Sequence, residues 1–167
     1  NQLHAEQAEA EPNKTSLSRM SKRIELLNKQ EKEIVAELRA LIKTDPKINE
    51  LVIHLCSLTG IGFLTAAIVL AETKGFDLIR NRRQLTSFAG LDVIEKQSGT
   101  SVKGKPKISK KGNRYLRKAM HHPALAAIQH DERFKAVYVR LVSKHGIKMK
   151  AMVAVQRKLL ELMFTIF

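Results

Sequence analysis

The most regular pattern in the chain is a series of apolar residues that recur in alternating steps of three and four. Only Glu31 interrupts the series, and most residues between its members are charged. This spacing predicts a long helix with a narrow apolar seam. The helix could pack on its own domain or form a coiled coil, either with a second copy or within one chain. The narrow seam favours a coiled coil, and a homodimer is expected. The members of the seam are Leu17, Met20, Ile24, Leu27, Ile34, Leu38 and Leu41.

Helix breakers divide the remainder into shorter segments. Asp45 and Pro46 suit the start of a helix that ends near Ser57, and the glycines of "TGIGF" then form a turn before a helix rich in small residues. Asn81 is placed to cap a short helix through Ala89. Beyond it the pattern predicts a loop or short hairpin over 92–109, a helix over 109–130 kinked at Pro123, and helices over 131–144 and 148–166.

These segments predict a mainly α fold. A long heptad helix is followed by a compact helical domain, which contains a helix-hairpin-helix-like Gly-x-Gly turn and one irregular basic loop. The expected organisation is a flexible start over 1–14, a coiled-coil or helical linker over 15–56 and a helical domain over 57–167. The chain begins with Asn and not Met, which indicates a piece of a longer protein.

The net charge of +14 is confined to the predicted domain. Residues 1–59 hold nine basic and nine acidic residues, whereas residues 60–167 hold 21 basic and seven acidic residues. A neutral first part and a strongly basic remainder indicate a nucleic-acid-binding domain on a scaffold. An anionic membrane would match the sign, but no basic amphipathic helix with an aromatic-rich apolar face is visible. The apolar C-terminal segment contains Arg157, Lys158 and Glu161, so it indicates a core helix.

The Gly-x-Gly turn is the first candidate for a binding site. Gly60 and Gly62 allow a tight turn that brings backbone N–H groups to a helix start, where they can hold a phosphate without reading bases. Ile61 between them would fill the core between the two helices. The alternative is a tight interhelical turn with no ligand.

A run of basic residues without any acid is the second candidate. Each phosphate that such a run neutralises steepens the salt dependence of binding by about 0.9 in log–log slope. The alternative is a solvated face, but solvated faces usually mix both signs. The run consists of Lys103, Lys105, Lys107, Lys110, Lys111, Arg114, Arg117 and Lys118.

The residues give little indication of a metal site, a disulfide or a self-contained hydrolytic site. His121 and His122 are adjacent and diverge on a helix, and no third ligand is near, so no metal site is predicted. Cys56 is the only cysteine, which excludes an internal disulfide and fits a reducing compartment. The acidic residues are dispersed, and no Ser-His-Asp pattern occurs. Ser98 lies in a flexible "QSGT" beside lysines. No nearby side chain could act as a general base and take its proton, and such a serine is most often part of a turn.

The ordered motifs resemble one family, the insertion sequence 110 transposases, which include the Piv-type DNA invertases. The resemblance covers about residues 50–167, and the heptad helix resembles the coiled-coil linker of the family. Its most specific parts are "FAGL", the Ser-Gly pair and "ISKKGN". The matching segments are "LTGIGFLTAAIVLAET", "RNRRQLTSFAGLDV", "KQSGT", "KISKKGNRYLRKAM" and "MVAVQRKLLELMF".

This resemblance implies functions that the spacing does not show. Ser98 matches the serine that attacks the DNA phosphodiester and forms a covalent phosphoserine. An N-terminal RuvC-like domain, outside this chain, would bind Mg²⁺ through four acids, so no cofactor is expected in this chain and the chain alone should be inactive. The resemblance also implies DNA and a guide RNA as partners, a dimer or tetramer, and the cytoplasm of a bacterium or archaeon.

Three hypotheses follow. The first is a C-terminal part of a DNA transposase with Ser98 as the nucleophile. The second is a non-catalytic helix-hairpin-helix module that binds nucleic acid. The third is a structural dimerisation protein whose charge only keeps it in solution.

Overall fold

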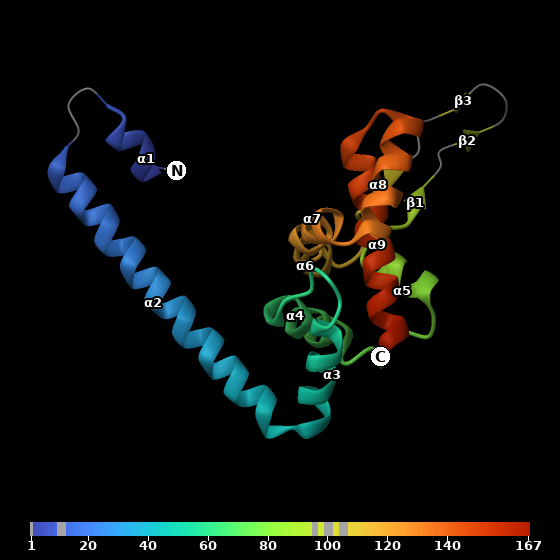
Figure 1. Ribbon diagram of the computed structural model, residues 1–167, viewed down its shortest axis with the longest axis horizontal. Coiled ribbons are helices and arrows are strands. Elements are labelled where there is room, and N and C mark those ends of the chain that lie inside the picture. The colour runs from blue at the N-terminus through green and yellow to red at the C-terminus, as the bar shows by residue number, and fades with distance from the viewer. Residues whose placement is uncertain (1, 10–12, 95–96, 99–101, 104–106) are drawn as a thin grey trace. The chain divides into compact units, whose positions relative to one another are not determined.

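The computed structural model describes residues 2–9, 13–94, 97–98, 102–103 and 107–167, and only the backbone at 97–98 and 102–103. Helices hold most of these residues, which confirms the mainly α fold (Figure 1). The chain forms two compact units, Asn1–Asn49 and Glu50–Phe167. No helix among the residues described here combines the length and apolar character needed to cross a membrane.

The first unit contains the predicted long helix. Helix α1 (Gln2–Gln7), which the sequence pattern did not predict, contacts α2 (Lys14–Thr44). The Asn13 side chain accepts hydrogen bonds from the Thr15 and Ser16 amides at 3.0 and 3.1 Å and so caps α2. Helix α2 ends at Thr44 with the extended residue Asp45 as its C-cap, before Pro46, which cannot supply the next helical N–H.

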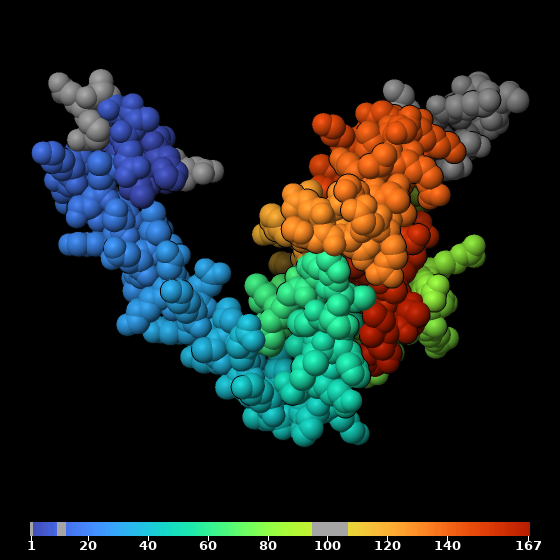
Figure 2. Space-filling view, in the orientation of Figure 1, coloured from blue at the N-terminus to red at the C-terminus, as the bar shows by residue number. Residues whose placement is uncertain are grey.

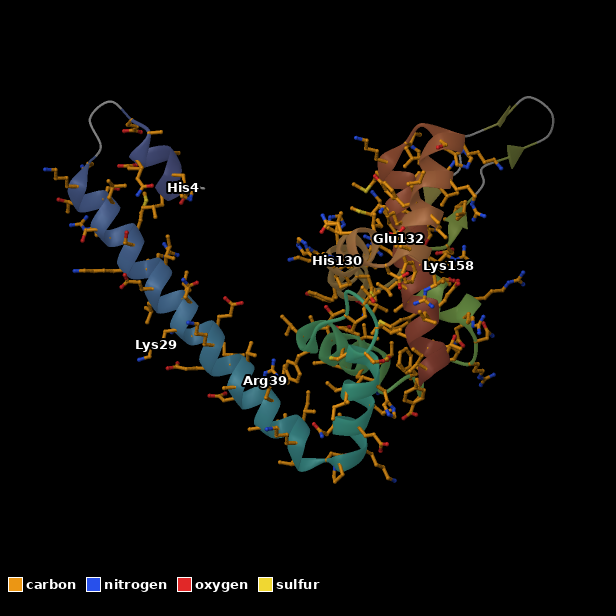
Figure 3. The ribbon with its side chains drawn as sticks, viewed as in Figure 1. His4, Lys29, Arg39, His130, Glu132 and Lys158 are labelled. Carbon is orange, nitrogen blue, oxygen red and sulfur yellow. The ribbon has the colours of Figure 1, made fainter. Side chains whose placement is uncertain are left out.

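The apolar seam of α2 is largely exposed. Side chains project from α2 on all sides (Figure 3), and four seam residues keep between 41% and 67% of their surface in solvent. Those residues are Ile24, Leu27, Ile34 and Leu41. An apolar stripe of this length favours a partner helix.

The second unit is a layered helical core. Helix α3 (Pro46–Cys56), which belongs to this unit from Glu50 onward, leads into α4 (Phe63–Thr73) and α5 (Arg82–Phe88). The later helices are α6 (Arg114–Ala119), α7 (His121–His130), α8 (Glu132–His145) and α9 (Lys148–Ile166). Helix α9 contacts α5, α7 and α8, and buries Val155, Leu159, Leu160 and Met163 at helical spacing. Helices α7 and α8 form much of the surface of this unit on the face shown in Figure 2.

The helix predicted over 109–130 is wrong at its start and in the place of its kink. It begins at Arg114, because the Asn113 side chain caps it, and it breaks at Met120. Pro123 lies in the first turn of α7, where its missing N–H costs little, whereas in a continuous helix its ring would clash with the carbonyl of Ala119. The proline therefore ends one helix and starts another.

Within 92–109, the described residues form two short antiparallel strand pairs, which agrees with the short hairpin that the sequence allows. Strand β1 (Val93–Ile94) pairs antiparallel with β4 (Lys107–Ile108), and Val93 is opposite Ile108. Further out, β2 (Gln97–Ser98) pairs antiparallel with β3 (Val102–Lys103), and Ser98 is opposite Val102. Both strand pairs lie at one end of the second unit in Figure 1. Ser98 therefore lies in a second, short strand pair that is separate from the pair formed by β1 and β4.

Candidate nucleic-acid interface

The hairpin base is held by a close crossing of two backbone segments. The Asn113 amide donates to Phe88 O at 2.6 Å, and the Lys110 amide donates to Gly90 O at 3.1 Å. A Cβ on Gly112 would lie 2.5 Å from Gly90 N and even closer to Phe88 O, so only glycine fits. The two motifs "FAGL" and "ISKKGN" thus form one structural feature, which we call the glycine crossing (residues 88–91 and 109–113).

Gly90 must adopt a left-handed backbone conformation within this crossing. It follows α5 with a φ of +67°, and its amide donates to Ser87 O while the Leu91 amide donates to Thr86 O, both at 2.8 Å. This pair of bonds is a Schellman motif, whose left-handed residue is usually glycine. The short helix predicted through Ala89 is confirmed, with Ala89 as its C-cap.

Side chains fasten the crossing to its surroundings. Arg117 Nη1 donates to Ala89 O at 2.7 Å, and its Nη2 lies 3.5 Å from Lys110 O. Asn113 Oδ1 accepts from the Tyr115 and Leu116 amides at 2.8 and 3.0 Å, while its Nδ2 donates to Glu72 on α4. These contacts fix the start of α6 against α4 and α5.

Ser109 connects the crossing to the hairpin. Its amide donates to Asp92 O at 2.9 Å, and its hydroxyl donates to the Asp92 carboxylate. This joins the two ends of the hairpin just below β1 and β4. The position of α6 and the direction of the hairpin are therefore set by the same group of contacts.

A groove of about 950 Å³, the α6 groove, brings together several predicted binding residues. It lies between α4, α6, α7 and α9, and it is lined by Lys110, Arg114, Arg117 and Lys118 with one carboxylate, Glu72. None of these basic side chains forms an ion pair with a carboxylate within the described ranges. An apolar groove with unpaired cations suits an anionic ligand with an apolar part.

Arg117 differs from the other three basic residues. It is half-buried and uses two of its N–H groups on protein carbonyls, whereas Lys110, Arg114 and Lys118 are exposed. Three of the five donors of a guanidinium stay available, so Arg117 adds charge to the groove while it also holds the glycine crossing.

The remaining basic residues of the run are distributed elsewhere. Lys107 lines a second, mostly apolar groove of about 540 Å³ beside β1, β4 and α9, which Lys110 also borders. Lys111 is exposed. Lys105 lies outside the described residues, and the side chains of Ser98 and Lys103 are likewise not described.

The Gly-x-Gly turn lies against α7. Gly60 has a φ of +92°, and a Cβ there would approach Pro123 O to 2.5 Å, so the glycine permits close helix packing. Ile61 is buried, as the sequence predicts, while Gly62 is exposed with no heavy atom near a Cβ position. Leu64 and Thr65, just after the turn, line the α6 groove. The turn thus adjoins the same groove as the basic residues.

The groove also contains residues that sequence reasoning missed. Tyr115 lies on its wall and is 63% exposed. Gln156, only 4% exposed, places its Nε2 atom 3.1 Å from His121 Nδ1, and both residues line the groove. The sequence could have indicated Tyr115 as a binding residue, since "NRYLRK" places an aromatic residue among basic ones. The pairing of Gln156 with His121 joins positions 35 residues apart and has no local signature.

Metal-ligating side chains do not gather in this part of the protein. Across the residues whose placement is described, no three His, Cys, Asp or Glu side chains lie close enough to share an ion. His121 and His122 have ring centroids 5.5 Å apart, but His121 Nδ1 is already engaged by Gln156. These residues therefore do not fit a Mg²⁺ site.

Comparison with known proteins places the chain among transposases. Residues 53–139, which extend from α3 into α8, match the Transposase IS116/IS110/IS902 family, and the chain belongs to this family. The match contains the glycine crossing, the hairpin and α6. It confirms the resemblance that the sequence motifs indicate.

Individual relatives agree with this family. The transposase for insertion sequence element IS1111A of Coxiella burnetii is 31% identical over 140 residues, or 80% of this chain and 37% of that protein. The pilin gene-inverting protein of Moraxella bovis is 28% identical over 127 residues, or 75% and 39%. The insertion element IS110 43.6 kDa protein of Streptomyces coelicolor is 28% identical over 138 residues, or 83% and 33%. The chain spans between 33% and 39% of the length of these relatives.

Proposed function

We propose that the chain is the C-terminal part of a longer transposase, and that the α6 groove holds phosphates of its DNA or of a guide RNA. The observation that carries this proposal is the gathering of Lys110, Arg114 and Lys118 on one groove without a carboxylate partner. Unpaired surface cations on a rigid support favour polyanion binding, because releasing the counterions of the nucleic acid supplies the free energy. The solvated-face alternative is less favoured, since that face would mix signs.

We further propose that Ser98 is the nucleophile of strand cleavage. The family motif supports this role, and the backbone of Ser98 belongs to the hairpin whose base is anchored beside the basic groove. The Mg²⁺ of the reaction would be bound by a RuvC-like domain outside this chain. The chain alone would then bind nucleic acid but not complete transposition. The competing hypothesis of a non-catalytic module predicts no role for the serine hydroxyl.

Removing the positive charge of the groove tests the binding proposal. We expect the triple variant Lys110→Gln, Arg114→Gln, Lys118→Gln to weaken duplex DNA binding and to lower the log–log salt slope by about 2.7, or about 0.9 per lost phosphate contact. Fluorescence anisotropy with labelled DNA between 50 and 200 mM salt would measure both changes. All three side chains are exposed, so folding should be little affected.

A matched triple variant controls for net charge. Lys14→Gln, Lys22→Gln, Lys32→Gln removes the same charge from exposed positions of α2. We expect its salt slope to stay close to that of the unmodified chain. Equal losses from the two triple variants would show that total charge matters and the groove does not.

We propose that α2 forms a homodimeric coiled coil through its exposed seam. Replacing Leu27 and Ile34 with lysine places two charges in the seam, and we expect dimers to dissociate into monomers in analytical ultracentrifugation. As a control, lysines at Glu25 and Ala36, exposed residues outside the seam, should leave the dimer intact. A monomeric unmodified chain at micromolar concentration would contradict the proposal.

A further inference from the structure

We infer that the α6 groove accepts an unstacked nucleobase, and that Tyr115 stacks on this base. This inference rests on the proposed nucleic-acid binding and adds the form of the ligand: a single strand, or a strand with one base turned out of the helix. DNA and RNA share this chemistry.

The first argument is the setting of Tyr115. The residue is 63% exposed although it belongs to a helix that is firmly held, and its amide donates to Asn113 Oδ1 at 2.8 Å. An exposed aromatic ring on a rigid support loses little conformational entropy when it binds a flat partner. Aromatic rings in this position are the usual stacking platforms for unpaired bases.

The second argument is the placement of charge around the ring. The guanidinium carbon of Arg114 lies 5.8 Å from the centre of the Tyr115 ring, within the range of a cation–π contact. Lys118 lies on the same groove. A base stacked on Tyr115 would therefore have cations within reach of its neighbouring phosphates, which is the combination that single-strand binding surfaces use.

The third argument is the interior of the groove. It offers apolar surface from Leu64, Ile68 and Val153, together with the side chain of Gln156, which is 4% exposed. A phosphate alone would gain nothing from apolar walls, whereas a base presents both an apolar face and a polar edge. The volume of about 950 Å³ gives a base room to enter.

The absence of tryptophan makes this inference directly measurable. The chain has two tyrosines and no tryptophan, so the variant Tyr138→Phe leaves Tyr115 as the only strong emitter. We expect unlabelled oligothymidine and oligouridine to quench its emission saturably as a base stacks on the ring. The oligomer that quenches at lower concentration identifies DNA or RNA as the source of the base.

Affinity provides the second measurement. In the otherwise unmodified chain, Tyr115→Leu should weaken binding to single strands, and to duplexes with one bulged base, by about 5- to 150-fold, the range for loss of one stacked base. Tyr115→Phe keeps the ring and should stay within about twofold. Binding to a fully paired duplex should be nearly unchanged in both variants, because no base is free to stack.

Failure of this inference can be told from failure of the proposed function. If binding depends on the groove charges but Tyr115→Leu affects all nucleic acids equally or not at all, or if the emission of Tyr115 is not quenched, only the stacking inference is overturned. If the chain binds no nucleic acid, both proposals are overturned.

Discussion

Replacing Gly112 with alanine is expected to lower the free energy of unfolding of the second unit by about 3 kcal/mol, the upper part of the range for overpacking. The new methyl group would lie 2.6 Å from Ser87 O and 2.5 Å from Gly90 N, and closer still to Phe88 O. All three atoms belong to the backbone, so no side chain can rotate away to make room. The crossing must open, which also breaks the hydrogen bond from the Asn113 amide to Phe88 O.

Urea unfolding followed by tyrosine fluorescence would measure this loss. Both tyrosines, Tyr115 and Tyr138, lie in the second unit, so the signal reports on that unit without contribution from α2. Gly62→Ala is the matched control, because its φ of −95° is ordinary for alanine and no heavy atom lies within 4 Å of the new methyl group. We expect the control to change stability by less than about 0.5 kcal/mol. Equal urea concentrations at the midpoint of unfolding for Gly112→Ala and Gly62→Ala would contradict the close approach of the two backbone segments.

The glycine crossing gives a physical reason for two of the family motifs. Gly90 is required for the left-handed end of α5, and Gly112 is required because another backbone lies against it. Arg117 then donates to the carbonyl of Ala89 between them. Gly90 and Gly112 help to position α6 and the base of the hairpin, so mutations of these two glycines should disturb binding although neither lines the groove.

Features set by local sequence were predicted well. The caps at Asn81 and Asp45 and the periodic apolar positions of α2 and α9 are signals within a few residues, and the corresponding helices have the expected bounds or nearly so. The predicted kink at Pro123 is misplaced, because the helix breaks at Met120 and Pro123 lies in the first turn of the next helix. Local rules allow both positions, and the packing of α7 against Gly60 favours the second.

Features set by contacts between distant residues were not predicted. Arg117 shares its predicted helix with Lys118, and nothing nearby in sequence shows that it binds Ala89, 28 residues away. Gln156 would be expected to face solvent, yet it is buried and lies against His121. The sequence therefore identifies the basic run only as a set of charges. The groove that brings four of these residues together results from the packing of α4, α6, α7 and α9.

Ser98→Ala in the full-length protein is expected to abolish strand cleavage, with a loss of about 10³-fold or more, as for removal of other enzymatic nucleophiles. In the proposed reaction, Ser98 Oγ loses its proton and forms a bond to phosphorus while one phosphorus–oxygen bond of the DNA backbone breaks. The departing sugar oxygen takes up a proton and leaves as a free hydroxyl. The intermediate is a covalent protein–DNA adduct that survives denaturation. Gel electrophoresis with labelled DNA under denaturing conditions would detect this adduct in the unmodified protein and should detect none in the variant.

The control for this experiment is the neighbouring hydroxyl. Ser101→Ala removes a serine from the same basic stretch and should retain the adduct, while both variants should bind DNA with unchanged salt dependence, since neither removes a charge. Loss of the adduct only with Ser98→Ala would separate the nucleophile from the binding surface. If Ser98→Ala recombines DNA at the normal rate, the catalytic proposal fails and the chain is better explained as a non-catalytic binding module. The charge dependence of the α6 groove would stand in that case, because it rests on Lys110, Arg114 and Lys118 and not on the serine.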